Sequence, residues 1–378
     1  TISPSGAFEA GSYQTFILTY TAGKFGIDDS GSLRVCFRFA SDQTRPQFED
    51  PKGPNYTTIS ASNNAILTHH YDPKGNVRPW DRTLYVKVVR GFLKNGDQIS
   101  IKFGDRSGGS PGMRLQTFCE ESYEFHTLID PIATYCYQPV CNHPTIKIIP
   151  GAPEKYLAIG PTIRAIGEAF SVKLKGEDKW GNPSDQCDVT FYPKAKLPLT
   201  RLPESISLAK GDFAVSIDNL LAHEAGDLTI DFYDDSGAIV FSTNPIRIEE
   251  SPKSRHFWGD IHGQSEETIG TGSAEDYFKF ARDRAFVDVI GHQGNDFQIT
   301  TEFWKHLDDL CAKFNQDGTF VNIPGYEWSG NTGLGGDRNV YFATEGRTIR
   351  RSSHALVSDH SDIGTDCNSA KELFAAFA

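Results

Sequence analysis

The stretch Phe257-Trp-Gly-Asp-Ile-His-Gly-Gln-Ser265 decides how this chain is interpreted, because a short apolar run in it ends in three polar, ligand-capable residues. Asp260, His262 and Gln264 are two residues apart, so in a β-strand their side chains point to one face. Burying three such groups for stability alone is costly. The stretch therefore predicts a functional site, of the metal-binding kind, at the carboxyl edge of a sheet or barrel.

Composition limits the classes of partner. The chain has 378 residues and a formal net charge of −12, which argues against nucleic acid or an anionic membrane surface as a partner. No apolar run approaches the ~20 residues that a membrane-spanning helix needs. The length indicates two or three domains. The seven scattered cysteines include no CxxC pair, which favours free thiols and a reducing, cytoplasmic compartment.

The first two thirds of the chain predict two β-sandwich domains. In residues 1–145, apolar runs alternate with turn residues, and Leu33, Val35 and Phe37 share one face of a half-buried strand. Residues 146–249 repeat this pattern around the turn 178–183 and resemble bacterial immunoglobulin-like modules. Such modules are spacers or surface-presenting units, so we expect no chemistry there.

Residues 250–378 change to alternating strands and helices. Ser273 and Asp276 are spaced as a helix cap, and apolar helical spacing follows them. Further strands are expected over 286–290 and 320–323, which predicts parallel α/β packing with sites at the strands' carboxyl ends. Ser369 and Glu372 cap a last helix. We expect the rest of this domain to come from the same gene or from a second chain, including an identical one.

Three successive strand ends present His262, His292 and Glu327. In a barrel such ends converge on one face, where residues distant in sequence share a metal ion. Imidazole together with carboxylate suits zinc, manganese or iron. Asn295, Asp296 and Gln298 follow His292 closely and are expected to line the pocket or to satisfy their own loop.

The motifs GDIHGQS, VDVIGHQGNDFQIT, IPGYEWSG and GGDRNVYF resemble the PHP (polymerase and histidinol phosphatase) hydrolase superfamily. They are closest to its branch known as domain of unknown function 3604. The resemblance covers residues 256–378. It implies a distorted (β/α)7 barrel, incomplete in this chain, that holds two or three divalent metal ions for hydrolysis.

The resemblance also implies a ligand set. His262 matches the first histidine of the family's HxH motif, His292 matches its Asp-His motif, and Glu327 matches a carboxylate that bridges two metals. Gln264 and Asp337 stand where relatives have histidine. Gly291 replaces the aspartate of the Asp-His motif, which predicts a reduced set of metal ions. For the family's later motifs the nearest residues are His354, Asp359 and His360.

Taken together, the residues and the resemblance predict a metal-dependent hydrolase of a small, anionic substrate. A phosphoester is the expected class, with an amide or carboxylic ester as the alternative. Asp260 would orient a ligand or take a proton, and Arg338 with the glycine-rich loop 329–336 would receive the anionic group. The alternative function is a non-catalytic binding or structural protein with a degenerate barrel, whose β-sandwich domains recognise a ligand or partner.

Overall fold

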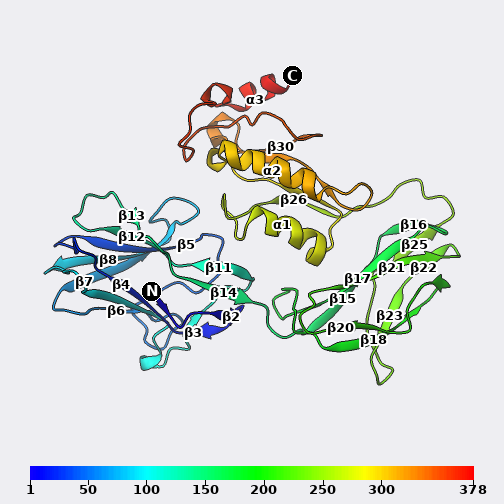
Figure 1. The fold of residues 1–378 in the computed structure, drawn as a ribbon, viewed down its shortest axis with the longest axis horizontal. Coiled ribbons are helices and arrows are strands. Elements are labelled where there is room, and N and C mark those ends of the chain that lie inside the picture. Colours follow the sequence, from blue (N-terminus) through cyan, green and yellow to red (C-terminus); the bar gives the residue numbers. More distant parts are fainter. The chain divides into compact units, whose positions relative to one another are not determined.

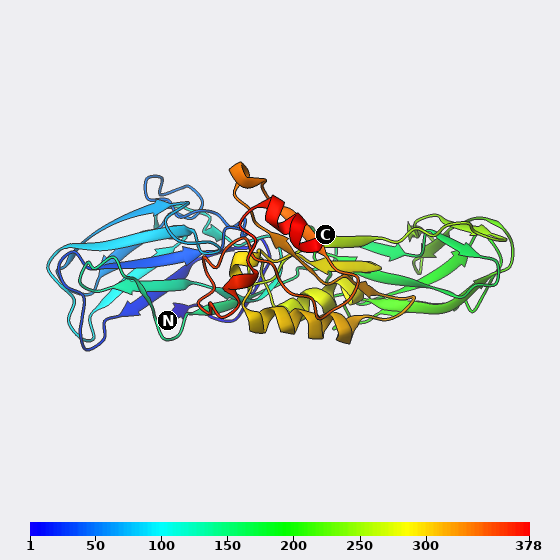
Figure 2. The same cartoon turned by 90° about the horizontal axis from the view of Figure 1, so that it is seen from above.

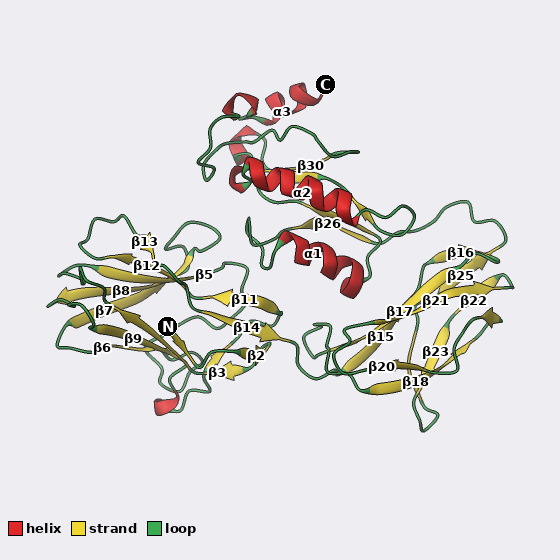
Figure 3. Ribbon diagram, viewed as in Figure 1, coloured by secondary structure: helices red, strands yellow, loops and turns green.

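The computed structural model describes all residues from 1 to 378 and divides into two compact units, Thr1–Pro150 and Gly151–Ala378. Strands predominate in both units, as the yellow arrows of Figure 3 show, and the α-helices all lie after Gly259. None of these helices is both long enough and apolar enough to cross a membrane.

The first unit is a β-sandwich (blue to cyan in Figures 1 and 2) whose larger sheets have the strand orders β1-β4-β9-β6 and β13-β12-β5-β8-β7. Two small sheets have the orders β10-β3 and β11-β14-β2. The strands are β1 (Ile2–Ser3), β2 (Ala7–Glu9), β3 (Tyr13–Gln14), β4 (Phe16–Thr21), β5 (Ser32–Phe37), β6 (Thr58–Ala61), β7 (Ile66–Asp72), β8 (Arg82–Arg90), β9 (Gln98–Phe103), β10 (Met113–Arg114), β11 (Glu120–Glu124), β12 (His126–Asp130), β13 (Gln138–Pro139) and β14 (Thr145–Ile149).

Alternation along β5 explains how this sandwich forms its core. Leu33, Val35 and Phe37 are at most 1% exposed and belong to one apolar cluster with inward side chains of β4, β8 and β9. Arg34, between them, lies on the opposite face of the same strand. The predicted inward face is confirmed, but the strand is more buried than predicted, because Ser32 and Cys36 on the opposite face are buried as well and only Arg34 is partly exposed.

The second unit begins with another β-sandwich, which has its own apolar cluster. Its sheets have the orders β15-β17-β21-β19, β20-β18-β23-β24 and β16-β25-β22. The turn predicted at 178–183 is present: Asp178 Oδ1 accepts the N–H of Trp180 at 2.8 Å and of Asn182 at 3.0 Å. The strands are β15 (Lys155–Ile159), β16 (Ile163–Ala165), β17 (Phe170–Glu177), β18 (Val189–Ala195), β19 (Leu199–Thr200), β20 (Ile206–Leu208), β21 (Val215–Ala222), β22 (Gly226–Leu228), β23 (Ile230–Tyr233), β24 (Ile239–Ser242) and β25 (Ile246–Glu249).

The remainder of the second unit contains a three-stranded parallel sheet, β26-β27-β28, and an antiparallel pair, β29-β30. Both predicted helix starts are confirmed, because Ser273 accepts the Asp276 N–H and Ser369 forms a capping box with Glu372. The elements are β26 (Gly259–Gly263), α1 (Ala274–Phe280), β27 (Val289–His292), α2 (Thr301–Phe314), β28 (Val321–Asn322), β29 (Gly325–Trp328), β30 (Arg338–Tyr341) and α3 (Ala370–Phe377).

The predicted PHP-like (β/α)7 barrel is wrong. Strand and helix alternate only as far as β28, and β29 then turns back to pair antiparallel with β30 instead of leading into a further helix and parallel strand. Residues 343–369 contain no strand and only one short 3-10 turn, Ile363–Thr365. The chain is therefore a β-rich protein with two sandwiches and a small α/β segment, not one with a barrel.

Candidate functional site

Glu327 on β29 is the centre of a cluster formed by residues from three strand ends. It is 9% exposed. Asn295 Nδ2 donates a hydrogen bond to its Oε1 at 3.0 Å, and Gln264 Nε2 donates to its Oε2 at 3.4 Å. His262 Nε2 lies 3.5 Å from the same Oε2. The structure thus brings together three of the predicted metal residues, His262, Gln264 and Glu327.

Backbone pairing explains why these residues meet. β26 and β27 run parallel, with Gly263 opposite His292, so the residues that follow each strand leave the sheet at the same edge. The chain after β27 then bridges to β29, where the N–H of Glu327 donates to the carbonyl of Gly294 at 2.9 Å. Asn295 is thereby placed beside the Glu327 carboxylate, although the two residues are 32 apart in sequence.

Electrostatics make Glu327 an unusual carboxylate. Its pKa is raised, first by burial and then by the neighbouring negative charge of Asp337, while His262 and the hydrogen bond from Asn295 oppose the shift. Two carboxylates near one half-exposed imidazole leave an excess of negative charge at this edge. Such a position favours a cation.

Gln264 and His292 are occupied by protein partners. Thr268 Oγ1 donates to Gln264 Oε1 at 3.0 Å, so the amide turns its nitrogen towards Glu327. His292 is 2% exposed, its Nδ1 accepts the Gly294 N–H at 3.3 Å, and its Nε2 lies 2.8 Å from the Ser265 hydroxyl. Burial lowers the pKa of His292 to about 3. A metal ion on His292 would have to displace one of these hydrogen bonds, and its ligand role stays a prediction.

Asp260 and Asp337 adjoin the cluster, Asp260 through the backbone of His262 and Asp337 through its charge on Glu327, and Arg338 follows Asp337 in sequence. Asp260 is exposed, and its Oδ1 accepts the N–H of His262 at 3.0 Å, leaving Oδ2 free. Asp337 is also exposed, and Arg338 Nη1 donates to its backbone carbonyl at 2.7 Å. The remaining N–H groups of Arg338 have no protein partner.

Asp296 lies behind this cluster and has a role that the sequence did not indicate. It is fully buried, and its Oδ1 accepts the Ser329 N–H at 2.8 Å and the Ser352 hydroxyl at 3.2 Å. The Ser352 N–H donates to its Oδ2. Burial raises its pKa, against the hydrogen bonds. Asp296 thus connects the end of β29 to the segment around Ser352. Asp296 and Ser352 are 56 residues apart, so no local motif predicts this contact.

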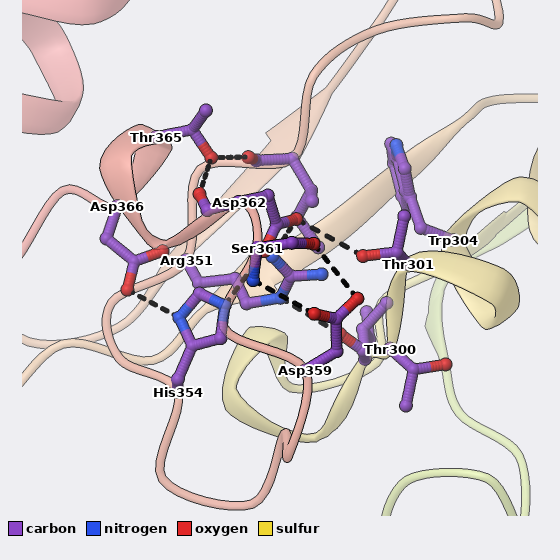
Figure 4. Close-up of polar contacts among 12 residues, drawn as sticks. Thr300, Thr301, Trp304, Arg351, His354, Asp359, Ser361, Asp362, Thr365 and Asp366 are labelled. Carbon is purple, nitrogen blue, oxygen red and sulfur yellow. Dashed lines mark hydrogen bonds and ion pairs between the residues drawn. The ribbon is translucent and has the colours of Figure 1, made fainter.

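A second carboxylate–imidazole cluster follows in the same segment (Figure 4). His354 lies between two carboxylates, with Nδ1 at 2.7 Å from Asp366 Oδ2 and Nε2 at 2.9 Å from Asp362 Oδ1. Arg351, which is fully buried, reaches Asp362 Oδ2 at 2.7 Å. Burial alone would lower the pKa of His354, but the two aspartates raise it. Both ring nitrogens of His354 are bonded to carboxylates, so neither is available to a ligand. The cluster instead links Arg351 and His354 to Asp362 and Asp366.

The Glu327 cluster has the donors that a divalent ion requires. Nε2 of His262 and Oε2 of Glu327 are 3.5 Å apart, which two ligands at about 2.1 Å from one ion have in near-tetrahedral geometry. Asn295 is 8% exposed and its Oδ1 is buried without a hydrogen-bond partner. It is Nδ2 of Asn295 that faces the carboxylate, so the fit to a divalent ion rests on the imidazole and the carboxylate, a pair that suits such an ion.

No protein-family model matches this sequence, and uncharacterised chlamydial proteins are among its relatives. An uncharacterised protein of Chlamydia pneumoniae is 22% identical over 279 residues, which cover 71% of this chain and 42% of that protein. One of Chlamydia trachomatis serovar D is 23% identical over 288 residues, which cover 73% of this chain and 44% of that protein. The chain therefore spans less than half the length of these relatives.

Solved structures give only a distant likeness. The Escherichia coli adhesin FdeC aligns with a TM-score of 0.27 and 14% identity over 67% of this chain and 63% of that chain. The Yersinia pseudotuberculosis adhesin InvE aligns with a TM-score of 0.21 and 10% identity over 66% of this chain and 57% of that chain. Scores of this size carry no argument about the function of this chain.

Proposed function

We propose that this chain binds a divalent metal ion through His262 and Glu327 and belongs to a metal-dependent hydrolase of a small, anionic substrate. Glu327 carries the proposal. Its carboxylate is 9% exposed, and its single ion-pair partner is His262, whose side chain is 54% exposed. A carboxylate taken out of water without full charge compensation is destabilising. A divalent ion held by His262 and Glu327 would reduce that cost, and zinc, manganese and iron all accept imidazole together with carboxylate.

When bound, such an ion lowers the pKa of a coordinated water to about 7 and stabilises negative charge on the reacting centre. The chain's own residues supply orientation. Asn295 fixes Oε1 of Glu327, and Oε2 lies near His262 while it accepts a long hydrogen bond from Gln264. The free Oδ2 of Asp260 is available to accept a proton, and the unpaired N–H groups of Arg338 are available to hold an anionic group.

A phosphoester is the substrate class that a divalent ion together with the guanidinium of Arg338 would favour. A guanidinium beside a divalent ion gives a tetrahedral oxyanion both a bidentate donor and charge neutralisation. An amide or a carboxylic ester is the alternative class, for which Arg338 would serve a carboxylate elsewhere on the substrate.

Elemental mass spectrometry of the purified chain, before and after incubation with zinc, manganese or iron, tests the proposal. We expect about one equivalent of metal, as in single-ion catalytic sites. E327Q should lose the metal together with hydrolysis of p-nitrophenyl phosphate. The matched control E302Q changes an exposed glutamate on α2 and should keep both. A wild-type chain that stays free of metal after incubation would contradict the proposal.

A second candidate function is non-catalytic binding, and the hydrogen bonds of Gln264 and His292 favour it. Both side chains are committed to protein partners, so only His262 and carboxylates remain as ligands. A binding protein should keep its fold and its ligand in E327Q, whereas a hydrolase should lose turnover. The comparison of E327Q with the wild type therefore separates the two candidates.

A further inference from the structure

We propose that the outer face of the sheet β13-β12-β5-β8-β7 in the first unit carries a binding pocket for a small oxyanion, centred on Arg34. The face has a hollow of about 190 Å³. Residues from β5, β7, β8 and the segment after β12 line it, among them Ser32, Arg34, His70, Tyr85, Lys87 and Tyr137. This pocket is separate from the Glu327 cluster and does not depend on it.

Strand register places the pocket residues in adjacent rows. Arg34 of β5 lies opposite Tyr85 of β8, and Tyr85 lies opposite His70 of β7. In the next row Ser32 lies opposite Lys87. Because side chains two apart on a strand share a face, the rows meet on the side turned away from the apolar core.

Aromatic rings hold the guanidinium of Arg34 in place. Its Cζ lies 3.6 Å from the ring centroid of Tyr137 and 4.7 Å from that of Tyr85. His70 stacks on Tyr85 at 4.6 Å with an interplanar angle of 10°, and the hydroxyls of Tyr137 and Ser32 lie 2.6 Å apart. The rings cover the faces of the guanidinium, so its N–H edge is ordered before any ligand arrives.

The charges of this pocket are not neutralised by the protein. The side chain of Arg34 makes no ion pair or hydrogen bond, and its Nε is buried without a partner. Lys87 has no ion-pair partner either. Asp130 is the acid of the pocket, but its oxygens accept from the N–H of Thr134 at 3.0 Å and of Tyr135 at 2.7 Å. Asp130 therefore shapes the loop that walls the pocket and leaves both cations available.

An oxyanion is the ligand that satisfies these groups. Exposed lysines on a sandwich face are commonly just solvated, yet a half-buried guanidinium with an orphaned N–H has lost solvent without gaining a partner. The hollow is smaller than the ~300–1,000 Å³ of sites for drug-sized ligands. It therefore suits a phosphate or carboxylate group, either free or at the end of a larger ligand, held by a planar donor fork.

Isothermal titration calorimetry of the full chain tests the pocket with inorganic phosphate, glucuronate and uncharged glucose. We expect phosphate and glucuronate to bind and glucose not to bind. The lower Kd of the two oxyanions shows whether the pocket prefers a phosphate or a carboxylate group. R34M keeps the apolar stem but loses the charged donors, and should weaken binding at least about tenfold. R90M, at the exposed end of the same strand β8, should bind as the wild type does.

Two further variants keep the test decisive if R34M fails to fold. R34K retains the charge without the planar fork and should bind more weakly than the wild type, and K87M should bind more weakly as well. The proposal is overturned if neither oxyanion binds the wild type. It is also overturned if R34M and R90M weaken oxyanion binding by the same factor. Binding would then depend on the overall positive charge of the surface and not on the pocket.

Discussion

The two carboxylate–imidazole clusters of the second unit use the same residue types and reach opposite states. His354 is 3% exposed and has a carboxylate on each ring nitrogen, so its charge is matched within the protein. His262 is 54% exposed and faces a single carboxylate, Glu327, whose pKa is raised. The charges of the His354 cluster are matched, although Arg351 Nη2 and Asp366 Oδ1 are buried without a partner, whereas the charges of the Glu327 cluster are not matched.

This difference indicates where to look for function. A histidine with both nitrogens bonded to carboxylates has no lone pair for a ligand or a substrate. A half-exposed histidine that faces one carboxylate, as His262 faces Glu327, still has a ring nitrogen available for a cation. Proximity of acids and imidazoles is therefore a weak sign of a site, whereas incomplete compensation is a stronger one.

Removing Arg351, the buried cation of the His354 cluster, should have the largest effect on stability. R351M leaves Asp362 without its guanidinium and the carbonyl of Ile299 without its donor. Breaking a buried pair from one side should lower the free energy of unfolding by about 3 kcal/mol. Denaturant titration measures this, with R347M, at an exposed position, as the control. Equal stability of the two variants would show that the cluster does not hold the segment.

Acid should reveal the buried neutral state of His292. Its pKa in the folded protein is about 3, below the ordinary value, so between that pH and about 6.5 only the unfolded state binds the proton. Stability should therefore fall with acid by up to about 1.4 kcal/mol per pH unit from this residue.

H292N should remove that component from the pH profile of unfolding. H306N, which changes an exposed histidine of α2, should leave the profile unchanged. A wild-type slope that persists in H292N would mean that His292 is not held neutral.

His354 should give a smaller effect of opposite sign. The pKa of His354 is raised in the folded protein by its two aspartates, against burial, so its stabilising contribution is complete below about pH 6.5. It should be lost as pH rises through the folded pKa. H354Q should lack this alkaline decline between pH 6 and 9, measured by thermal unfolding. Superimposable wild-type and variant profiles would argue against a charged His354.

Local patterns in the sequence predicted local structure well. The alternation of Leu33, Val35 and Phe37, the turn at Asp178 and the caps at Ser273 and Ser369 each depend on residues a few positions apart. Helix caps and half-buried strands are set by such short-range chemistry. For these elements the residues alone were sufficient.

The same short-range reasoning could not predict that the chain leaves the barrel pattern after β28. Strand–helix alternation up to β28 is compatible with a barrel, but whether β29 pairs with a parallel or an antiparallel neighbour depends on contacts across the glycine-rich loop 329–336. A glycine-containing link between two short strands also favours a hairpin, and β29 and β30 form one.

The sites were predicted in part for the same reason. The spacing of Asp260, His262 and Gln264 indicated a strand-end cluster, and His262 and Gln264 do meet Glu327. Asp260 instead accepts the backbone N–H of His262. The partners of Asp296 and the alignment of Arg34 with Tyr85 depend on long-range contacts and strand register. A single sequence does not specify either of these.

Calorimetric titration of zinc into the wild type, H262A and H354Q tests the central claim most directly. We expect H262A to weaken binding at least about tenfold, because losing a metal ligand should cost no less than losing one of its supporting partners. We expect H354Q to bind as the wild type does, because both ring nitrogens of His354 are bonded to carboxylates and neither is available to the ion. Equal affinities for H262A and the wild type, or a loss confined to H354Q, would contradict metal binding through His262.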